Sequence, residues 1–226
     1  MRQQRLFVTL LFLVLGAILC VFPGKVVCAA AQEVFQENGD AWPVAPMSPD
    51  RSDDAYAIYS YIVEGRFPID LMANKPQWLI ADTTVIATEE WMPPREAIFP
   101  PLAQAQAFPA VLADYDQHKY ERVRLEREFH LDITPYRLLS RAEVAEYKRL
   151  KEAADARQDN SMPLKYQGAS GVIFFSNVYF NFDHSLALVY VAHWCGKTCG
   201  EMRWIVLAKI NGGWEQLNWN ALTGHP

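Results

Sequence analysis

The sequence predicts an α+β fold in which N-terminal helices pack on a C-terminal four-stranded antiparallel meander. Three observations support this fold class. Apolar residues in the first part of the chain recur at helical spacing, at Ala55, Ile58, Tyr59 and Ile62. From Val172 onward they recur at every second position, as in a strand. The segment Asn211-Gly212-Gly213 is a strong hairpin signal between two such runs.

The first 31 residues have the order of a secretory signal peptide. Arg2 and Arg5 precede an apolar run over residues 6–22, and a stretch of small residues then leads to Gln32. Ala29 and Ala31 form an A-x-A site, which places the cut before Gln32. Alternatively, residues 6–22 stay as an inner-membrane anchor, because 17 residues reach the lower limit of a membrane span. The predicted location is periplasmic or secreted, and a cleaved chain contacts the membrane only transiently, through this segment.

The rest of the chain predicts a flexible lead-in over residues 32–51 and one α+β domain over residues 52–226. The lead-in is polar and contains three prolines. Ser52 is a suitable N-cap for the first helix, which Gly65 ends.

Three further elements are expected before the meander. Residues 78–88 are β-branched and apolar, which favours a buried strand. Residues 110–128 have a helical composition. Ser140 and Glu143 have the spacing of a capping box, so another helix is expected to begin there and run to about Arg157.

The meander itself is predicted from Val172 to Trp219. Its first strand is expected to carry Val172, Phe174, Val178, Phe180 and Phe182 on one face. Asp183 and His184 form a turn, and the following strands alternate over residues 186–194 and 203–210. Trp194 and Trp204 share a face with the larger apolar residues, which favours positions in the core.

Charge limits the classes of partner. The formal net charge is −5, and removal of residues 1–31 takes away three basic residues and no acidic ones. An acidic domain without a basic stripe argues against a nucleic acid or an anionic membrane as the partner. A protein, a peptide or an envelope component remains.

Cys195 and Cys199 are the cysteines left after the signal segment. They lie between two strands of a predicted hairpin and a glycine follows each, so a structural disulfide across the hairpin tip is expected. One alternative is a thiol-redox pair, although such pairs usually have two intervening residues at the start of a helix. The other is a metal site with His193, but a structural zinc site needs four ligands and a second pair is missing. The sequence therefore predicts no metal and no cofactor.

Asp82 is the weak candidate for an acid–base group, together with His184 or His193. Asp82 interrupts an apolar strand, and a buried carboxylate needs a partner. The structural interpretation is a satisfied carboxylate at a strand end, and the functional one is an acid in a pocket. His193 alternates with valines on a sheet face, which is more typical of a wall residue than of a catalyst.

Several segments together resemble an uncharacterised family of exported bacterial proteins. They are the helix Tyr56-Ala-Ile-Tyr59-Ser60, the strand Leu79-Ile-Ala-Asp82-Thr-Thr84, the strand Ala187-Leu-Val-Tyr190, the loop Cys195-Gly-Lys-Thr-Cys199-Gly200 and the turn Gly213-Trp214. The resemblance implies one domain with a C-terminal meander. It implies no activity, so no catalytic residue is carried over.

Three functional hypotheses follow. The first is an exported, disulfide-stabilised module without enzymatic activity that binds a protein, peptide or envelope ligand, and it predicts exposed aromatic surface. The second is a hydrolase-like enzyme in which Asp82 meets His184 or His193 within hydrogen-bond reach. The third is a thiol-redox protein that uses Cys195 and Cys199.

Overall fold

The structure is a computed structural model that describes residues 43–66, 77–88, 92–98, 105–132, 135–158 and 161–217. Contacts divide the chain after Pro43, and the fold is that of the second unit, which begins at Val44. The predicted signal peptide, residues 1–31, lies outside the described residues, as does Trp219. Across the described ranges, no helix combines the length and apolarity needed to cross a membrane.

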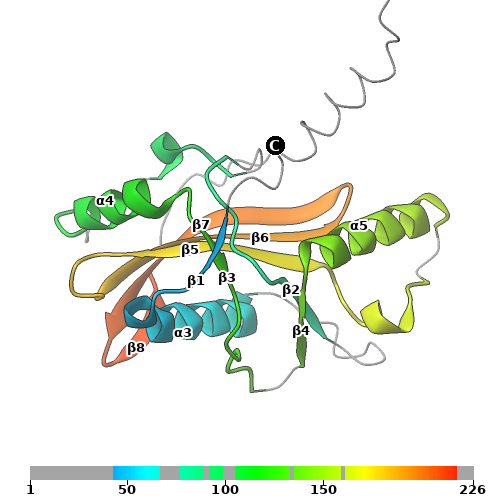
Figure 1. The fold of residues 1–226 in the computed structure, drawn as a ribbon, viewed down its shortest axis with the longest axis horizontal. Helices are drawn as coiled ribbons and strands as arrows, with labels where there is room; N and C mark the ends of the chain where they lie inside the picture. The colour runs from blue at the N-terminus through cyan, green and yellow to red at the C-terminus, as the bar shows by residue number, and fades with distance from the viewer. Residues whose placement is uncertain are drawn as a thin grey trace, which may run out of the picture. The chain divides into compact units, whose positions relative to one another are not determined.

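The described elements are shown in Figure 1, where η denotes a short 3₁₀ helix. In chain order they are β1 (Val44–Pro46), α3 (Pro49–Arg66), β2 (Trp78–Ala81), η1 (Arg95–Ala97), α4 (Phe108–His118), β3 (Arg122–Arg124), β4 (Tyr136–Leu139), α5 (Arg141–Ala156), η3 (Leu164–Tyr166), β5 (Val172–Phe180), β6 (Leu186–Gly196), β7 (Cys199–Ile210) and β8 (Gly213–Gln216).

The main sheet has six strands in the order β4-β2-β5-β6-β7-β8, and β1 pairs with β3 in a separate two-stranded sheet. The fold class α+β is confirmed, but the predicted four-stranded meander is wrong as a description of the sheet. Strands β5 to β8 are antiparallel as expected, and β2 and β4 extend them with parallel pairing. Parallel neighbours are joined by long connections without a turn signal, so this pairing left no local pattern in the sequence.

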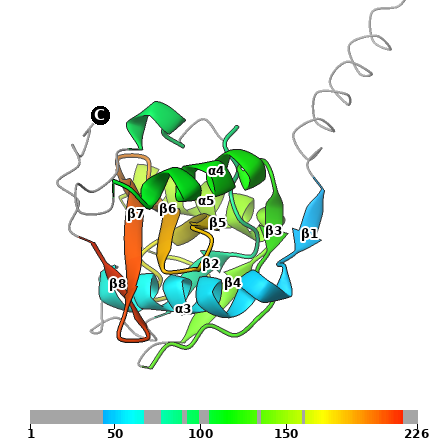
Figure 2. The same cartoon turned by 90° about the vertical axis from the view of Figure 1, so that its left-hand side faces the viewer.

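Helices cover both faces of the sheet, as Figure 2 shows. On one face α4 and α5 pack over a core that includes Val111, Tyr147 and Trp204. On the other face α3 packs over a second core that includes Tyr59 and Trp214. The helices therefore do not form one N-terminal layer on the sheet, and the strands between them are apolar on both sides.

Three segments differ from the predicted elements. The strand expected over residues 78–88 is present but shorter, as β2 ends at Ala81. Helix α3 begins at Pro49, three residues before the expected N-cap Ser52, so the end of the predicted lead-in is ordered as β1 and the first helical turn. Helix α4 ends at His118, and residues 122–124 form β3 where a helix was expected. The alternation of arginine with Val123 in this segment is a strand pattern that its charged composition obscured. The capping box of Ser140 and Glu143 is confirmed at the start of α5.

A bulge in β5 changes which side chains face each helix layer. The pairing with β6 shifts register between Phe175 and Val178. Phe174 therefore lies in the core under α4 and α5, whereas Val178 and Phe180 lie in the core under α3. The predicted common face of this strand is wrong, because an inserted residue inverts the alternation beyond it. Phe182 lies beyond the end of the strand.

Candidate functional site

The sheet has two ends with different chemistry. We call one the turn end: it holds the β5–β6 turn (residues 181–185), the β7–β8 turn (residues 211–212) and the start of α3. We call the other the disulfide end: it is the tip of the β6–β7 hairpin, around Cys195 and Cys199. Figure 1 shows the two at opposite sides of the domain, and Figure 2 views the turn end, where the β5–β6 turn lies between α4 and α3.

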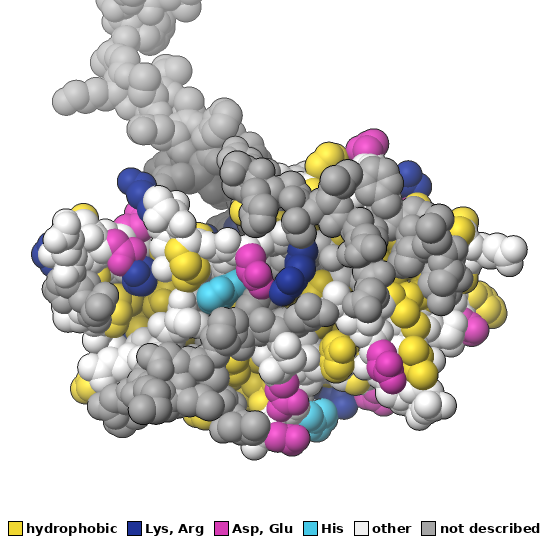
Figure 3. All heavy atoms as spheres, turned by 180° about the vertical axis from the view of Figure 1, so that it is seen from behind, with side chains coloured by type: hydrophobic (Ala, Val, Ile, Leu, Met, Phe, Trp, Pro, Cys, Tyr) yellow, Lys and Arg dark blue, Asp and Glu magenta, His cyan; other side chains and the backbone are white. Residues whose placement is uncertain are grey.

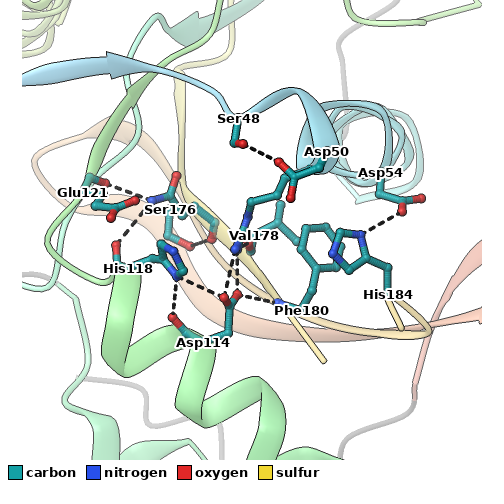
Figure 4. Close-up of polar contacts among 12 residues, drawn as sticks. Ser48, Asp50, Asp54, Asp114, His118, Glu121, Ser176, Val178, Phe180 and His184 are labelled. Atoms are coloured by element: carbon teal, nitrogen blue, oxygen red, sulfur yellow. Dashed lines mark hydrogen bonds and ion pairs between the residues drawn. The ribbon is translucent and has the colours of Figure 1, made fainter. Parts of the chain in front are cut away.

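An ion pair joins α3 to α4 at the turn end (Figure 4). Arg51 donates from both terminal nitrogens to the carboxylate of Asp114, over 2.9 and 2.6 Å. Arg51 Nη2 also donates to the Val178 carbonyl oxygen at 2.7 Å, and its guanidinium carbon lies 5.4 Å from the centre of the Phe180 ring. Two-point pairing with further contacts is the geometry in which arginine holds a fixed position.

Asp114 also accepts from other groups. The Phe180 amide donates to Asp114 Oδ2 at 2.8 Å, and His118 Nδ1 lies 3.0 Å from Oδ1. Burial acts to raise the pKa of Asp114, but the bonds from Arg51 and Phe180 outweigh it and hold the pKa below its ordinary value. The carboxylate is therefore kept ionised, and the same atoms that pair with Arg51 also fix the last residue of β5.

The bulge of β5 is satisfied by polar contacts beside this ion pair. Tyr59 donates to the Ser176 carbonyl oxygen at 2.9 Å, and the Ser176 hydroxyl accepts from the Tyr190 amide at 2.8 Å. Asn177 donates to the Glu121 carbonyl oxygen at 3.0 Å. These bonds replace the ladder bonds that the bulge interrupts and connect it to α3 and to the end of α4.

The β5–β6 turn is held by its own side chains and carries a fully exposed aromatic ring. Asn181 Oδ1 accepts from the amides of Ser185 and Leu186 at 2.9 and 2.8 Å. Asp183 Oδ1 accepts from the Ser185 hydroxyl at 2.7 Å. Between these residues, the side chain of Phe182 is 101% exposed. A large apolar side chain that is completely solvated on an ordered turn lacks a structural role within the described fold.

Asp54 of α3 fixes the other side of the turn end. Its Oδ1 accepts from Lys209 at 2.7 Å and from the Trp214 indole at 3.1 Å, and its Oδ2 lies 3.3 Å from His184 Nδ1. The His184 ring stacks on Phe180 at 4.4 Å. Burial acts to raise the pKa of Asp54, but these donors outweigh it and leave the pKa lowered. One carboxylate thus joins the two turns to the helix.

The disulfide end is closed covalently. Cys195 and Cys199 form a disulfide, with their Cα atoms 5.1 Å apart. Gly200 allows a close strand approach, because a Cβ there would lie 2.9 Å from the His193 carbonyl oxygen. With the sulfurs bonded to each other, neither is a thiolate metal ligand, and the described residues contain no cluster of histidine, cysteine and acidic side chains that could hold a metal ion.

The structure does not bring Asp82 together with either histidine. Asp82 pairs with Arg124 at 3.0 Å. Burial raises the pKa of Asp82, and Arg124 partly offsets that effect. His184 is beside Asp54, and His193 lies on β6 opposite Glu201 of β7. Burial lowers the pKa of His193, with a smaller opposing effect from Glu201.

The sequence predicted the turn at Asp183 and His184, but not the roles of Arg51, Asp114 and Phe182 at the turn end. Arg51 and Asp114 are 63 positions apart and lie on helices that show no shared motif. Phe182 was assigned to the strand, because the alternation hid the bulge before it. The available signal was the Asn-Phe-Asp-His-Ser segment, in which residues typical of turns surround one aromatic residue.

No family model, curated protein or solved structure matches the chain. The arrangement of its own residues therefore carries the functional argument.

Proposed function

We propose that this chain is an exported, disulfide-stabilised binding module without enzymatic activity, which contacts a protein or another envelope component through Phe182 at the turn end. The observation that carries the proposal is the complete exposure of Phe182 on a turn held in place by hydrogen bonds. Burying a phenylalanine side chain stabilises an assembly by about 1.5–3 kcal/mol. Exposed aromatic residues of this kind are frequent energetic centres of interfaces.

The fixed geometry of the turn favours a role in binding, rather than that of an ordinary solvated loop. Side-chain bonds from Asn181 and Asp183 order the backbone on both sides of Phe182 before a partner arrives. A partner therefore does not bear the entropy cost of ordering the turn, which raises affinity. Trp204 and Trp214 are buried in the two cores and are unsuited to this role, and Tyr61 and Tyr120 are only 37% and 46% exposed.

Two further features are compatible with the proposal. A disulfide persists in an oxidising compartment, which fits a periplasmic or secreted location. Asp82 pairs with Arg124, His184 lies beside Asp54, and His193 lies opposite Glu201. The hydrolase-like alternative requires Asp82 within hydrogen-bond reach of one of the two histidines, so these contacts argue against it. In the face shown in Figure 3, acidic and basic side chains are interspersed among apolar ones, unlike the single-sign stripe of a nucleic-acid site.

Site-specific photo-crosslinking tests the binding function. A benzophenone amino acid is placed at Phe182 in the full chain, and the purified protein is irradiated in an extract of the compartment that holds the wild-type protein. We expect a discrete adduct that an excess of purified wild-type protein suppresses and an excess of the Phe182→Ala protein does not. The matched control is the same crosslinker at Leu164, which is 77% exposed on η3. No adduct at position 182, or equal suppression by both competitors, would contradict the proposal.

Export is tested separately. Mass spectrometry of the protein recovered after cell fractionation is expected to give a chain that begins at Gln32, outside the cytoplasm. A chain that retains residues 6–22 and sediments with membranes would support the anchored alternative. A reduced, cytoplasmic protein would contradict export in either form.

A further inference from the structure

We infer that the partner of the turn end is a cationic protein surface, with an apolar pocket that receives Phe182 and a rim of lysine or arginine side chains. The inference rests on the proposed binding function and adds the chemistry of the partner. Three features of the turn end carry it: two exposed carboxylates, one of them next to Phe182, cations that already bond to other carboxylates, and a second exposed apolar side chain on the neighbouring turn.

Two carboxylates of the turn end, Asp183 and Asp50, face water. Asp183 follows Phe182 directly, and the Ser185 hydroxyl bonded to it lowers the pKa of Asp183. Asp50 lies at the start of α3, where a bond from Ser48 lowers the pKa of Asp50. Asp50 precedes Arg51, whose guanidinium lies over the Phe180 ring just before the β5–β6 turn, and the charges of Arg51 and His184 also lower the pKa of Asp50. Both groups are therefore ionised at neutral pH.

The basic side chains that the structure describes at the turn end form their hydrogen bonds with carboxylates other than these two. Arg51 is bound by Asp114 through two bonds, and its side chain is 19% exposed. Lys209 is bound to Asp54 at 2.7 Å. Each of these two described cations already has a carboxylate of its own, so the charges of Asp50 and Asp183 leave the described part of the turn end with a net negative rim.

The neighbouring turn extends the apolar part of the surface. The Lys209 amide donates to the Ser185 carbonyl oxygen at 2.8 Å, so the end of β7 lies against the β5–β6 turn. Ile210, the next residue, is 40% exposed. A partner pocket that encloses Phe182 therefore has a second apolar contact close by, and the two carboxylates lie where the polar rim of an interface is expected.

The negative rim disfavours the other occupants. In a symmetric contact with a second copy, the same patch faces itself, and like charges would be brought together. Anionic lipid head groups and nucleic acid phosphates carry the same sign as the rim. A cationic protein surface gains from both features, because opposite charge accelerates association and the ring supplies buried apolar area.

The test uses the crosslinker at Phe182 in the full chain, with added charge variants, mixed with an extract of the compartment that holds the protein. We expect Asp183→Lys to reduce the adduct about tenfold, and an increase of sodium chloride from about 50 to 500 mM to weaken it as well. Glu152→Lys is the matched control: it makes the same change of charge at an exposed position on α5 and is expected to leave the adduct unchanged.

The outcomes separate the two proposals. An adduct that wild-type protein suppresses, but that neither Asp183→Lys nor salt weakens, would leave the binding function standing and overturn the cationic partner. An adduct with the mass of two copies of this chain, or with lipid, would also overturn it. The absence of any suppressible adduct would remove the binding function itself.

Discussion

The two ends of the sheet are held by different means. The disulfide end is closed by residues four positions apart, through one covalent bond and closely approaching backbones. The turn end is held by side chains far apart in the sequence, since Asp54 bonds to Lys209 across 155 positions and Arg51 bonds to Asp114 across 63. The disulfide end can form within a local hairpin. The bonds of the turn end form only when α3 has packed against α4 and the sheet. The proposed binding surface is therefore at the end of the sheet whose structure requires the complete fold.

The largest expected effect comes from breaking the ion pair at the turn end. Arg51→Ala leaves the half-buried carboxylate of Asp114 without its main partner, and we expect a loss of about 3 kcal/mol in the free energy of unfolding. Urea denaturation of the purified protein measures it. Arg95→Ala is the control, because Arg95 of η1 pairs at the surface with Asp116, which lies on α4 as Asp114 does. This substitution is expected to cost less than about 0.5 kcal/mol. Equal losses would mean that the two pairs have equivalent roles.

The next effect concerns the disulfide end. Replacement of Cys195 and Cys199 by serine removes a short crosslink, with an expected loss of about 2 kcal/mol from the change in chain entropy. Thermal unfolding with and without reductant measures it, and reductant is expected to destabilise only the wild type. The crosslink at Phe182 is expected to persist in the double variant. Its disappearance would show that the two ends are coupled.

A smaller effect is expected for Asp54 and depends on pH. The folded-state pKa of Asp54 is below its unfolded value, so its contribution is complete above an unfolded pKa of about 3.9 and is lost as pH falls through the folded pKa. We expect stability to decline below about pH 4, and Asp54→Asn to cost about 1 kcal/mol at pH 7 while making that decline shallower. Urea denaturation between pH 7 and 3 checks this. If stability declines below about pH 4 as steeply in Asp54→Asn as in the wild type, other carboxylates cause the decline.

The smallest expected effect on stability comes from Phe182. Since the ring has no buried surface, Phe182→Ser is expected to change the free energy of unfolding by less than about 0.5 kcal/mol while abolishing the competition described for the crosslink. This combination separates a binding role from a structural one. A loss of stability larger than that of Leu164→Ser would indicate that the ring packs on the fold.

Local signals in the sequence predicted the elements whose causes are local. The capping box of α5, the antiparallel strands β5 to β8, the turn at Asp183 and His184, and the pairing of Cys195 with Cys199 all follow from residues a few positions apart. The buried strand predicted within residues 78–88 is present as β2, Trp78–Ala81. Its parallel pairing and the strand β4 could not be predicted, because they depend on contacts between distant segments.

The candidate site was missed for a related reason. One inserted residue at Ser176 or Asn177 reverses the faces of β5, and alternation alone does not reveal such a bulge. Asp82 and His193 are polar residues in apolar runs, whereas Arg51 fell at the end of the predicted lead-in and Asp114 had the pattern of an ordinary charge on a helix surface. Their importance arises from the packing of α3 and α4 around the end of β5.

The long separation of the bonded residues at the turn end has a consequence for the timing of folding. Helix α3 leaves the ribosome early, but its partners Val178, Lys209 and Trp214 are made near the end of synthesis. A chain dominated by such distant contacts folds slowly, because the entropy of large loops must be overcome before the contacts form. Under the proposed export, this delay favours passage through a narrow translocation channel, which requires an extended polypeptide.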